Sequence, residues 1–156
     1  MAKQKRAKPP SDTPRRVVVD SGPLLALFNR SDAWHAKSVK WLRDNPGARL
    51  TTTWSVATEV CALLARRISN DAALDFLRWA NRGGVDIDMP APSSLAEIVS
   101  ISERFADLPF DLADASVAEA AGRLQIKHVL TIDSDFTVYR DQHGRALLNA
   151  LAASGK

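Results

Sequence analysis

Hydrophobic positions along this chain follow two alternating patterns. Short apolar or β-branched runs predict strands, and longer segments with apolar residues three or four positions apart predict helices between them. The first run, Val17 to Val19, contains no polar residue, which indicates a strand buried on both faces. The expected strands cover residues 17–19, 50–53, 85–89 and 128–132.

Two helical segments separate each strand from the next. Ser21 with Pro23 predicts the start of the first helix, and Asp32 predicts the cap of the second. The order β-α-α-β-α-α-β-α-α-β is typical of an α/β protein with a parallel sheet covered by helices on both faces. The helices are expected near residues 24–28, 32–45, 55–67, 70–81, 93–105 and 111–124.

Composition and charge divide the chain of 156 residues unevenly. Residues 1–16 hold six basic residues and one acid, so the remainder carries −2 of the total charge of +3. This segment has three prolines and no periodicity, and we expect a disordered basic tail that either attracts nucleic acid or only aids solubility. A single globular domain is expected over 17–145, and a C-terminal tail or short helix over 146–156.

Cysteine content and hydropathy exclude several protein classes. The chain has one cysteine, so it cannot form an internal disulfide, and this is typical of a reducing compartment. Its apolar runs are shorter than the ~18 residues of a transmembrane helix, and the N-terminus lacks the apolar core of a signal peptide. We therefore expect a cytoplasmic protein without a membrane partner.

Acidic residues stand at the positions where α/β proteins bind ligands. Asp20 and Asp133 each follow a predicted strand, and ligands bind beyond the carboxyl ends of parallel strands. Glu59 lies on the apolar stripe of a helix, where it is either a site residue or an edge residue paired with a nearby arginine. Asp111 and Asp114 open a helix three positions apart, which is also the pattern of a helix cap.

Taken together, these acids predict a metal site. Several converging carboxylates cannot all stay ionised without a cation. The three histidines lie far apart in the sequence, so zinc is not favoured, and oxygen ligands alone select Mg²⁺ or Mn²⁺. An acidic site of this kind is typical of enzymes that hydrolyse phosphodiesters.

The ordered segments VVVDSG, ATEV, PFDLADAS and VLTIDSDF resemble those of PIN-domain ribonucleases, and more narrowly the VapC-type toxins of toxin–antitoxin pairs. The resemblance extends over most of residues 17–140. It implies a three-layer α/β/α sandwich with a central parallel sheet of four to five strands. It also implies Mg²⁺- or Mn²⁺-dependent endoribonuclease activity on RNA, a cognate antitoxin and a homodimer.

Carried onto this sequence, the family's acids fall on Asp20, Glu59, Asp114 and Asp133, which are the expected catalytic residues. The resemblance implies that Asp20 and Asp114 bind the metal directly. Possible accessory residues, which the same segments contain, are Asp111, Asp135 and Ser21.

Three further interpretations depend on less specific signals. Trp54 follows a strand near the expected site and is a candidate for stacking on an RNA base. The same acids also fit a PIN-type RNA-processing nuclease outside a toxin–antitoxin pair. A receiver-like phospho-acceptor module with Mg²⁺ is disfavoured, because Asp20 has no adjacent acid and the last strand ends in Asp133 rather than a lysine.

Overall fold

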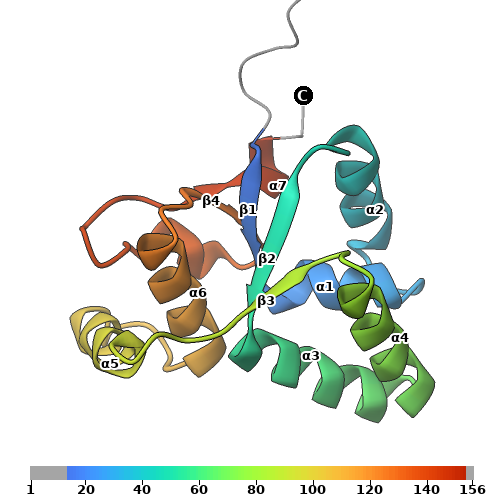
Figure 1. The fold of residues 1–156 in the computed structure, drawn as a ribbon, viewed down its shortest axis with the longest axis horizontal. Coiled ribbons are helices and arrows are strands. Elements are labelled where there is room, and N and C mark those ends of the chain that lie inside the picture. Colours follow the sequence, from blue (N-terminus) through green and yellow to red (C-terminus); the bar gives the residue numbers. More distant parts are fainter. Residues whose placement is uncertain (1–13, 154–156) are drawn as a thin grey trace, which may run out of the picture.

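The computed structural model describes residues 14–153, and most of the predicted basic tail lies outside this range. Five strands form one sheet in the order β3-β2-β1-β4-β5, and every neighbouring pair is parallel (Figure 1). This confirms the predicted α/β class and its parallel sheet of four to five strands. The strands are β1 (Arg16–Val19), β2 (Arg49–Thr53), β3 (Asp86–Asp88), β4 (His128–Leu130) and β5 (Leu148–Asn149).

The central strand β1 carries the core. The side chains of Val17, Val18 and Val19 are fully buried, as expected for a strand with helices on both faces. Val18 pairs with Thr51 of β2 on one side and with Val129 of β4 on the other. Strands far apart in the sequence are thereby fixed next to each other at the middle of the sheet.

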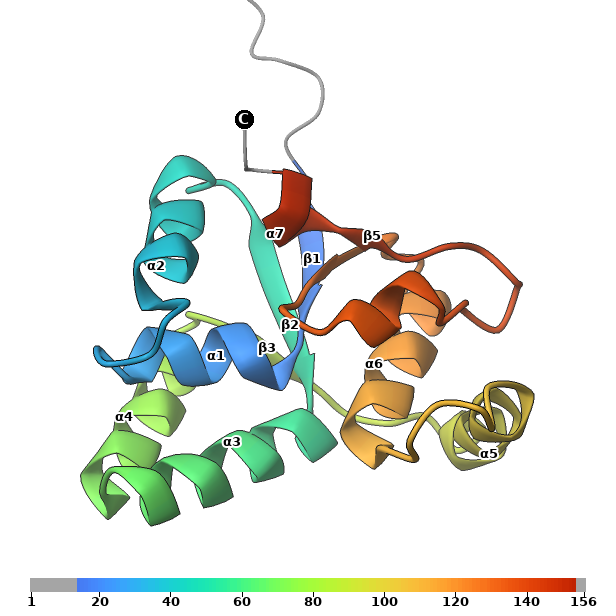
Figure 2. The ribbon, with the colours of Figure 1, turned by 180° about the vertical axis from the view of Figure 1, so that it is seen from behind.

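Helices cover both faces of the sheet in a three-layer arrangement, with α1 to α4 on one side and α5 and α6 on the other (Figures 1 and 2). The helices are α1 (Ser21–Phe28), α2 (His35–Asp44), α3 (Trp54–Arg67), α4 (Asn70–Asn81), α5 (Ser94–Arg104), α6 (Leu112–Arg123) and α7 (Ala150–Ala153), and a 3-10 turn, η1, spans Ser134–Thr137. Within the described range, no helix combines the length and apolarity needed to cross a membrane.

Two predicted helix starts differ from the structure. Asp20, and not Ser21, caps α1, because its carboxylate accepts the backbone N–H of Ser21 at 2.7 Å. Helix α2 begins at His35 rather than after Asp32, since the Asp32 carboxylate accepts the N–H of Trp34 inside a preceding turn. Aspartate satisfies backbone N–H groups in turns as readily as at helix caps, and the sequence does not distinguish the two.

Candidate metal centre

The acidic residues gather at the carboxyl-terminal edge of the sheet. Asp20 follows β1 and Asp133 lies three residues beyond β4, the strand paired with β1. Helix α3 begins directly after β2 and brings Glu59 to the same edge, and α6 brings Asp114 (Figure 2). Besides burial, the charges of Asp20, Asp133 and Glu59 raise the pKa of Asp114. These acids therefore lie close enough to interact.

Asp20 is held rigidly at the floor of the site. Its side chain is 3% exposed, its backbone N–H donates to Leu130 at 3.0 Å, and its second carboxylate oxygen accepts the Thr131 hydroxyl at 2.9 Å. Burial raises the pKa of Asp20 to about 6, against the lowering effect of the hydrogen bonds that its carboxylate accepts from the Ser21 N–H and the Thr131 hydroxyl. The strand and its neighbour therefore fix both the position and the orientation of this carboxylate.

Asp114 and Asp111 have different roles at the start of α6. The Asp111 carboxylate accepts the N–H of Asp114 at 3.0 Å, so Asp111 is the helix cap. Asp114 in the first turn is 7% exposed and faces the other acids. Burial and the neighbouring carboxylates, Asp20 first among them, raise the pKa of Asp114 to about 8. Capping and site formation thus divide between the two acids.

The turn after β4 supplies two more carboxylates. Asp133 caps η1 by accepting the N–H of Asp135 at 2.9 Å, and its own N–H donates to the Thr131 hydroxyl. One carboxylate oxygen from each of Asp114, Asp133 and Asp135 lies within 4.8 Å of the others. Asp135 therefore joins the group as a candidate ligand equal to Asp133.

Glu59 lies at the margin of the site. It is half-buried on α3, and its charge acts on both Asp20 and Asp114. No ion pair joins it to Arg66 or Arg67 in the described part of the chain, although the sequence left that alternative open. Its placement is that of a residue on the rim of the acidic cluster.

Comparison with known proteins identifies the fold. The family model described as PIN domain matches residues 17–142. The chain belongs to the PIN domain family. No curated protein matches the chain in sequence. Several solved structures are similar to it, and two of them follow. The toxin VapC20 of Mycobacterium tuberculosis, whose description is sarcin-ricin loop cleaving toxin, has a TM-score of 0.72 at 20% identity, covering 78% of this chain and 93% of that one.

The second structure is the VapBC2 complex of Rickettsia felis bound to a DNA fragment from its promoter. The TM-score of the matching chain is 0.61 at 10% identity, covering 86% of this chain and 96% of that one. At these identities the two structures establish the similarity of fold. Both support the PIN architecture over most of this chain.

The donor set of this PIN domain fits a divalent cation. Among residues 14–153, no lysine, arginine or histidine forms an ion pair with Asp20, Asp114, Asp133 or Asp135. The cluster consists of hard carboxylate oxygens, and burial, with mutual repulsion added to it, raises the pKa values of Asp20 and Asp114. A bound divalent cation would relieve this repulsion, and hard carboxylate oxygens suit cations such as Mg²⁺ and Mn²⁺.

Two functional neighbours of the PIN site are not apparent from the sequence. Thr131 connects Asp20 and Asp133 through one hydroxyl, which donates to the first residue and accepts from the second. Tyr139 is buried beside Phe136, and burial together with the charges of the surrounding aspartates raises the pKa of its hydroxyl to about 12. The position of Thr131 two residues before Asp133 was the sequence signal available for Thr131, and no sequence signal indicated Tyr139.

Gly22 allows the start of α1, next to Asp20, to approach the segment after β4 that contains Asp133. A Cβ atom at this position would lie 2.5 Å from Cγ1 of Ile132, the residue between Thr131 and Asp133. The start of α1 therefore packs directly against the segment that contains Asp133 and Asp135. A glycine here keeps Asp20 and Asp133 at one site.

Proposed function

We propose that this protein is an Mg²⁺- or Mn²⁺-dependent endoribonuclease. The observation that carries the proposal is the convergence of Asp20, Asp114, Asp133 and Asp135 at one sheet edge without a compensating cation from residues 14–153. A bound divalent ion supplies an activated water and stabilises charge on the attacking and leaving oxygens of a phosphodiester. The family and the solved VapC20 toxin support RNA as the substrate.

The acidic side chains have different roles in the proposed site. Asp114, with Asp133 and Asp135, forms the closest group of ligand oxygens, and Asp20 contributes from the floor of the site. Direct binding by Asp20 and Asp114 remains our prediction, with Asp135 added by its geometry. Glu59 on the rim orients water or accepts a proton. Asp111 contributes by capping the helix that presents Asp114.

The biological role proposed is that of a toxin in a cytoplasmic toxin–antitoxin pair. The VapC20 and VapBC2 structures support this, since one is described as a toxin and the other as a complex of that type. We further propose an antitoxin that covers the site, a homodimer, and a basic tail whose residues 1–14 are dispensable for chemistry. An RNA-processing nuclease with the same chemistry is the alternative, and family membership now argues against the receiver-like module.

Cleavage of RNA by the purified protein tests the chemistry. We expect cleavage with Mg²⁺ or Mn²⁺ that stops in excess EDTA and falls at least 100-fold in Asp20→Asn and Asp114→Asn. Asp107→Asn is the matched control, because Asp107 is exposed and lies outside the cluster. Metal-independent cleavage, or full activity in both site variants, would refute the proposal.

The toxin role has a separate test. Expression of the wild-type chain should stop growth, and expression of the Asp114→Asn chain should not. Co-expression of a small gene encoded next to it should restore growth. An active nuclease that leaves growth unaffected would favour the processing alternative.

A further inference from the structure

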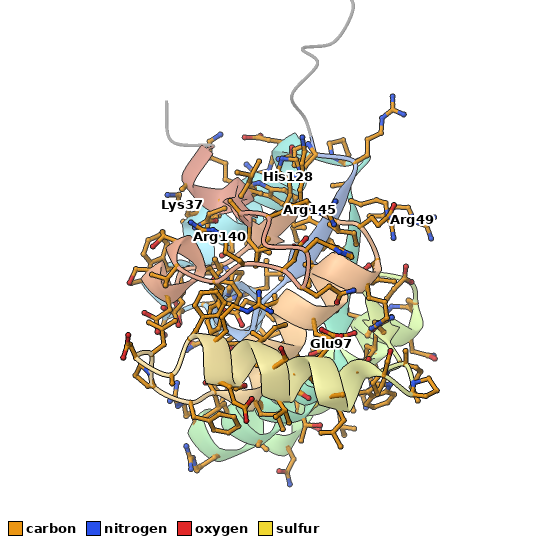
Figure 3. The ribbon with its side chains drawn as sticks, turned by 90° about the vertical axis from the view of Figure 1, so that its left-hand side faces the viewer. Lys37, Arg49, Glu97, His128, Arg140 and Arg145 are labelled. Carbon is orange, nitrogen blue, oxygen red and sulfur yellow. The ribbon has the colours of Figure 1, made fainter. Side chains whose placement is uncertain are left out.

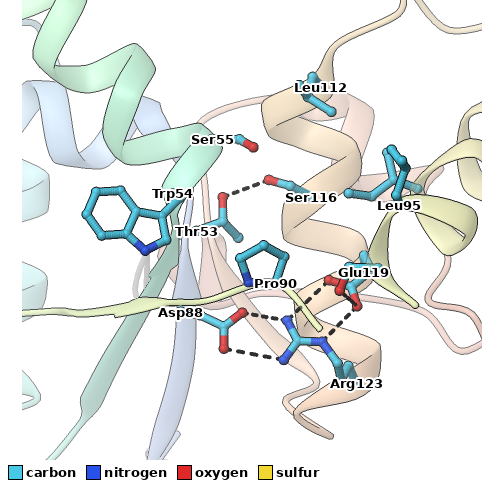
Figure 4. A pocket seen from close by; sticks show the side chains of 12 residues that line it. Thr53, Trp54, Ser55, Asp88, Pro90, Leu95, Leu112, Ser116, Glu119 and Arg123 are labelled. Atoms are coloured by element: carbon cyan, nitrogen blue, oxygen red, sulfur yellow. Dashed lines mark hydrogen bonds and ion pairs between the residues drawn. The ribbon is translucent and has the colours of Figure 1, made fainter. Parts of the chain in front are cut away.

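A pocket of about 220 Å³ lies along the same sheet edge as the acidic cluster, includes none of its acids in its lining, and has no part in the chemistry described so far. It opens between the start of α3, the residues after β3, and helices α5 and α6 (Figure 4). Its walls are mainly apolar, with Trp54 and Pro90 on one side and Leu95 and Leu112 on the other. Three of these side chains are notably exposed for their size: Trp54 at 48%, Leu95 at 71% and Leu112 at 48%.

The floor of the pocket is polar and rigid. Glu119 is 3% exposed and accepts the Ser94 hydroxyl at 2.9 Å and the Arg123 guanidinium at 2.8 Å. The same guanidinium also donates to both oxygens of Asp88 at the end of β3 (Figure 4). Buried charges paired in this way cannot reorient freely, so the floor presents a fixed set of carboxylate and hydroxyl acceptors.

Helix α3 connects the pocket to the acidic cluster. Ser55 lines the pocket and Glu59 lies four residues later, so the two share one face of the helix and are separated by one turn. Ser55 points toward α6 in Figure 4, and its hydroxyl has no hydrogen-bond partner among the described side chains. The pocket occupies the ends of β2 and β3, and the acids occupy the ends of β1 and β4, all along one sheet edge.

We propose that this pocket binds a nucleobase of the RNA next to the cleaved phosphate and thereby sets the base preference of cleavage. This inference rests on the proposed ribonuclease function. The pocket is smaller than the ~300–1,000 Å³ of sites for drug-sized ligands, which suits one planar ring system. Apolar walls with an aromatic side chain stack on a base, and the polar floor and Ser55 hydrogen-bond its edge.

Charge distinguishes this pocket from a phosphate site. Asp88 and Glu119 face one arginine, so the floor carries no excess positive charge and disfavours an anion. Arg140 and Arg145 lie above helix α5 in the view of Figure 3 and do not line the pocket, and the Arg145 guanidinium is engaged by Asp141. The neutral base, rather than the backbone, is therefore the part of RNA that the pocket accepts.

The test measures binding and cleavage separately. Binding is measured by titrating short single-stranded RNAs, intact or with one abasic position each, in the presence of Mn²⁺. The proteins are Asp114→Asn, and Asp114→Asn combined with Trp54→Ala or with Leu95→Ala. We expect either pocket substitution to weaken the binding of intact RNA roughly five-fold or more. We also expect one particular abasic position to weaken RNA binding when the pocket is intact, and to have no further effect on binding once Trp54 or Leu95 is replaced. Val99→Ala is the matched control, an apolar residue of α5 that is 47% exposed, close to the 48% of Trp54, and that lies outside the pocket lining.

Cleavage of a randomised RNA pool gives the second readout. The wild-type and Val99→Ala proteins should share a base preference at one position beside the cut, and Trp54→Ala and Leu95→Ala should lose it. Binding that is insensitive to the pocket substitutions, or an unchanged preference, would overturn the inference. So would a change in mass by light scattering with unchanged RNA affinity, because the pocket would then be a contact between two copies.

The two readouts separate this inference from the function on which it rests. RNA binding that depends on the pocket, without metal-dependent cleavage, would refute the nuclease and leave the base pocket standing. Cleavage that needs Asp114 but ignores Trp54 and Leu95 would refute the pocket and leave the nuclease standing.

Discussion

Replacing Asp114 by asparagine should stabilise the metal-free protein at neutral and higher pH. The carboxyl group is 7% exposed, no cation of residues 14–153 pairs with it, and burial with the nearby Asp20 and Asp111 raises its pKa from 3.8 to about 8. Asparagine has nearly the same shape and no charge. The variant therefore removes an electrostatic cost of folding without removing any side-chain hydrogen bond found in the structure.

The magnitude follows from proton linkage. In the unfolded chain Asp114 ionises near pH 3.8, whereas the folded state retains its proton up to about pH 8. At pH 7 the difference is about three pH units, which corresponds to a ceiling of about 4 kcal/mol at ~1.4 kcal/mol per unit. Counter-ions and relaxation of the neighbouring acids reduce this, and we expect a gain of about 2 kcal/mol.

The sign of the pH dependence is fixed by the raised pKa. Between pH 3.8 and about 8 the folded state binds more protons than the unfolded state, so the wild type loses stability as pH rises. Below pH 3.8 both states are protonated and the advantage of Asp114→Asn disappears. Above about pH 8 the advantage is complete and constant.

Urea unfolding followed by circular dichroism in EDTA, from pH 4 to 8.5, measures this difference. The free energy of unfolding of Asp114→Asn should exceed that of the wild type increasingly with pH, and Asp107→Asn should track the wild type. A variant that is equally stable or less stable at pH 8 would refute the electrostatic account of the site.

Three further outcomes are expected. Removing Mn²⁺ with EDTA should lower the melting temperature of the wild type and leave that of Asp114→Asn unchanged, by calorimetry; an equal shift in both would contradict metal binding by this residue. Gly22→Ala should reduce RNA cleavage through its clash with Ile132, and Ile132→Ala should rescue it in the double variant. Arg123→Met should cost about 3–5 kcal/mol in urea unfolding by leaving Glu119 buried without its partner, and adding Glu119→Gln should recover part of this loss.

Much of the fold and of the acidic cluster was predictable because each acid has a distinct local context. Three consecutive valines identify the central strand, and an acid after such a strand lies at the edge where ligands bind. Asp20 and Asp133 both carry this signal. Asp114 was identified only in combination with the others, since Asp111 and Asp114 also form a helix cap, and the structure shows that capping belongs to Asp111.

The unpredicted features depend on distances between segments remote in the sequence. The hydrogen bond from Thr131 to Asp20 exists because β1 and β4 are neighbours, and the spacing of Thr131 and Asp133 in the sequence does not reveal that pairing. Asp135 is a candidate metal ligand alongside Asp133 because the tight turn of η1 brings both carboxylates to the same group. The pocket beside the cluster requires β3, α5 and α6 to meet, and its lining residues have no common sequence pattern.

The pairing of β1 with β4 also determines when the site can exist during synthesis. Asp20 leaves the ribosome early, but its partner Thr131, together with Asp133 and Asp135, follows only after 110 further residues have been made. Contacts of such long sequence separation form late in folding. A nascent chain that has not yet emerged past Asp135 therefore lacks a complete acidic cluster, and for a ribonuclease this order of assembly delays activity until most of the domain has been made.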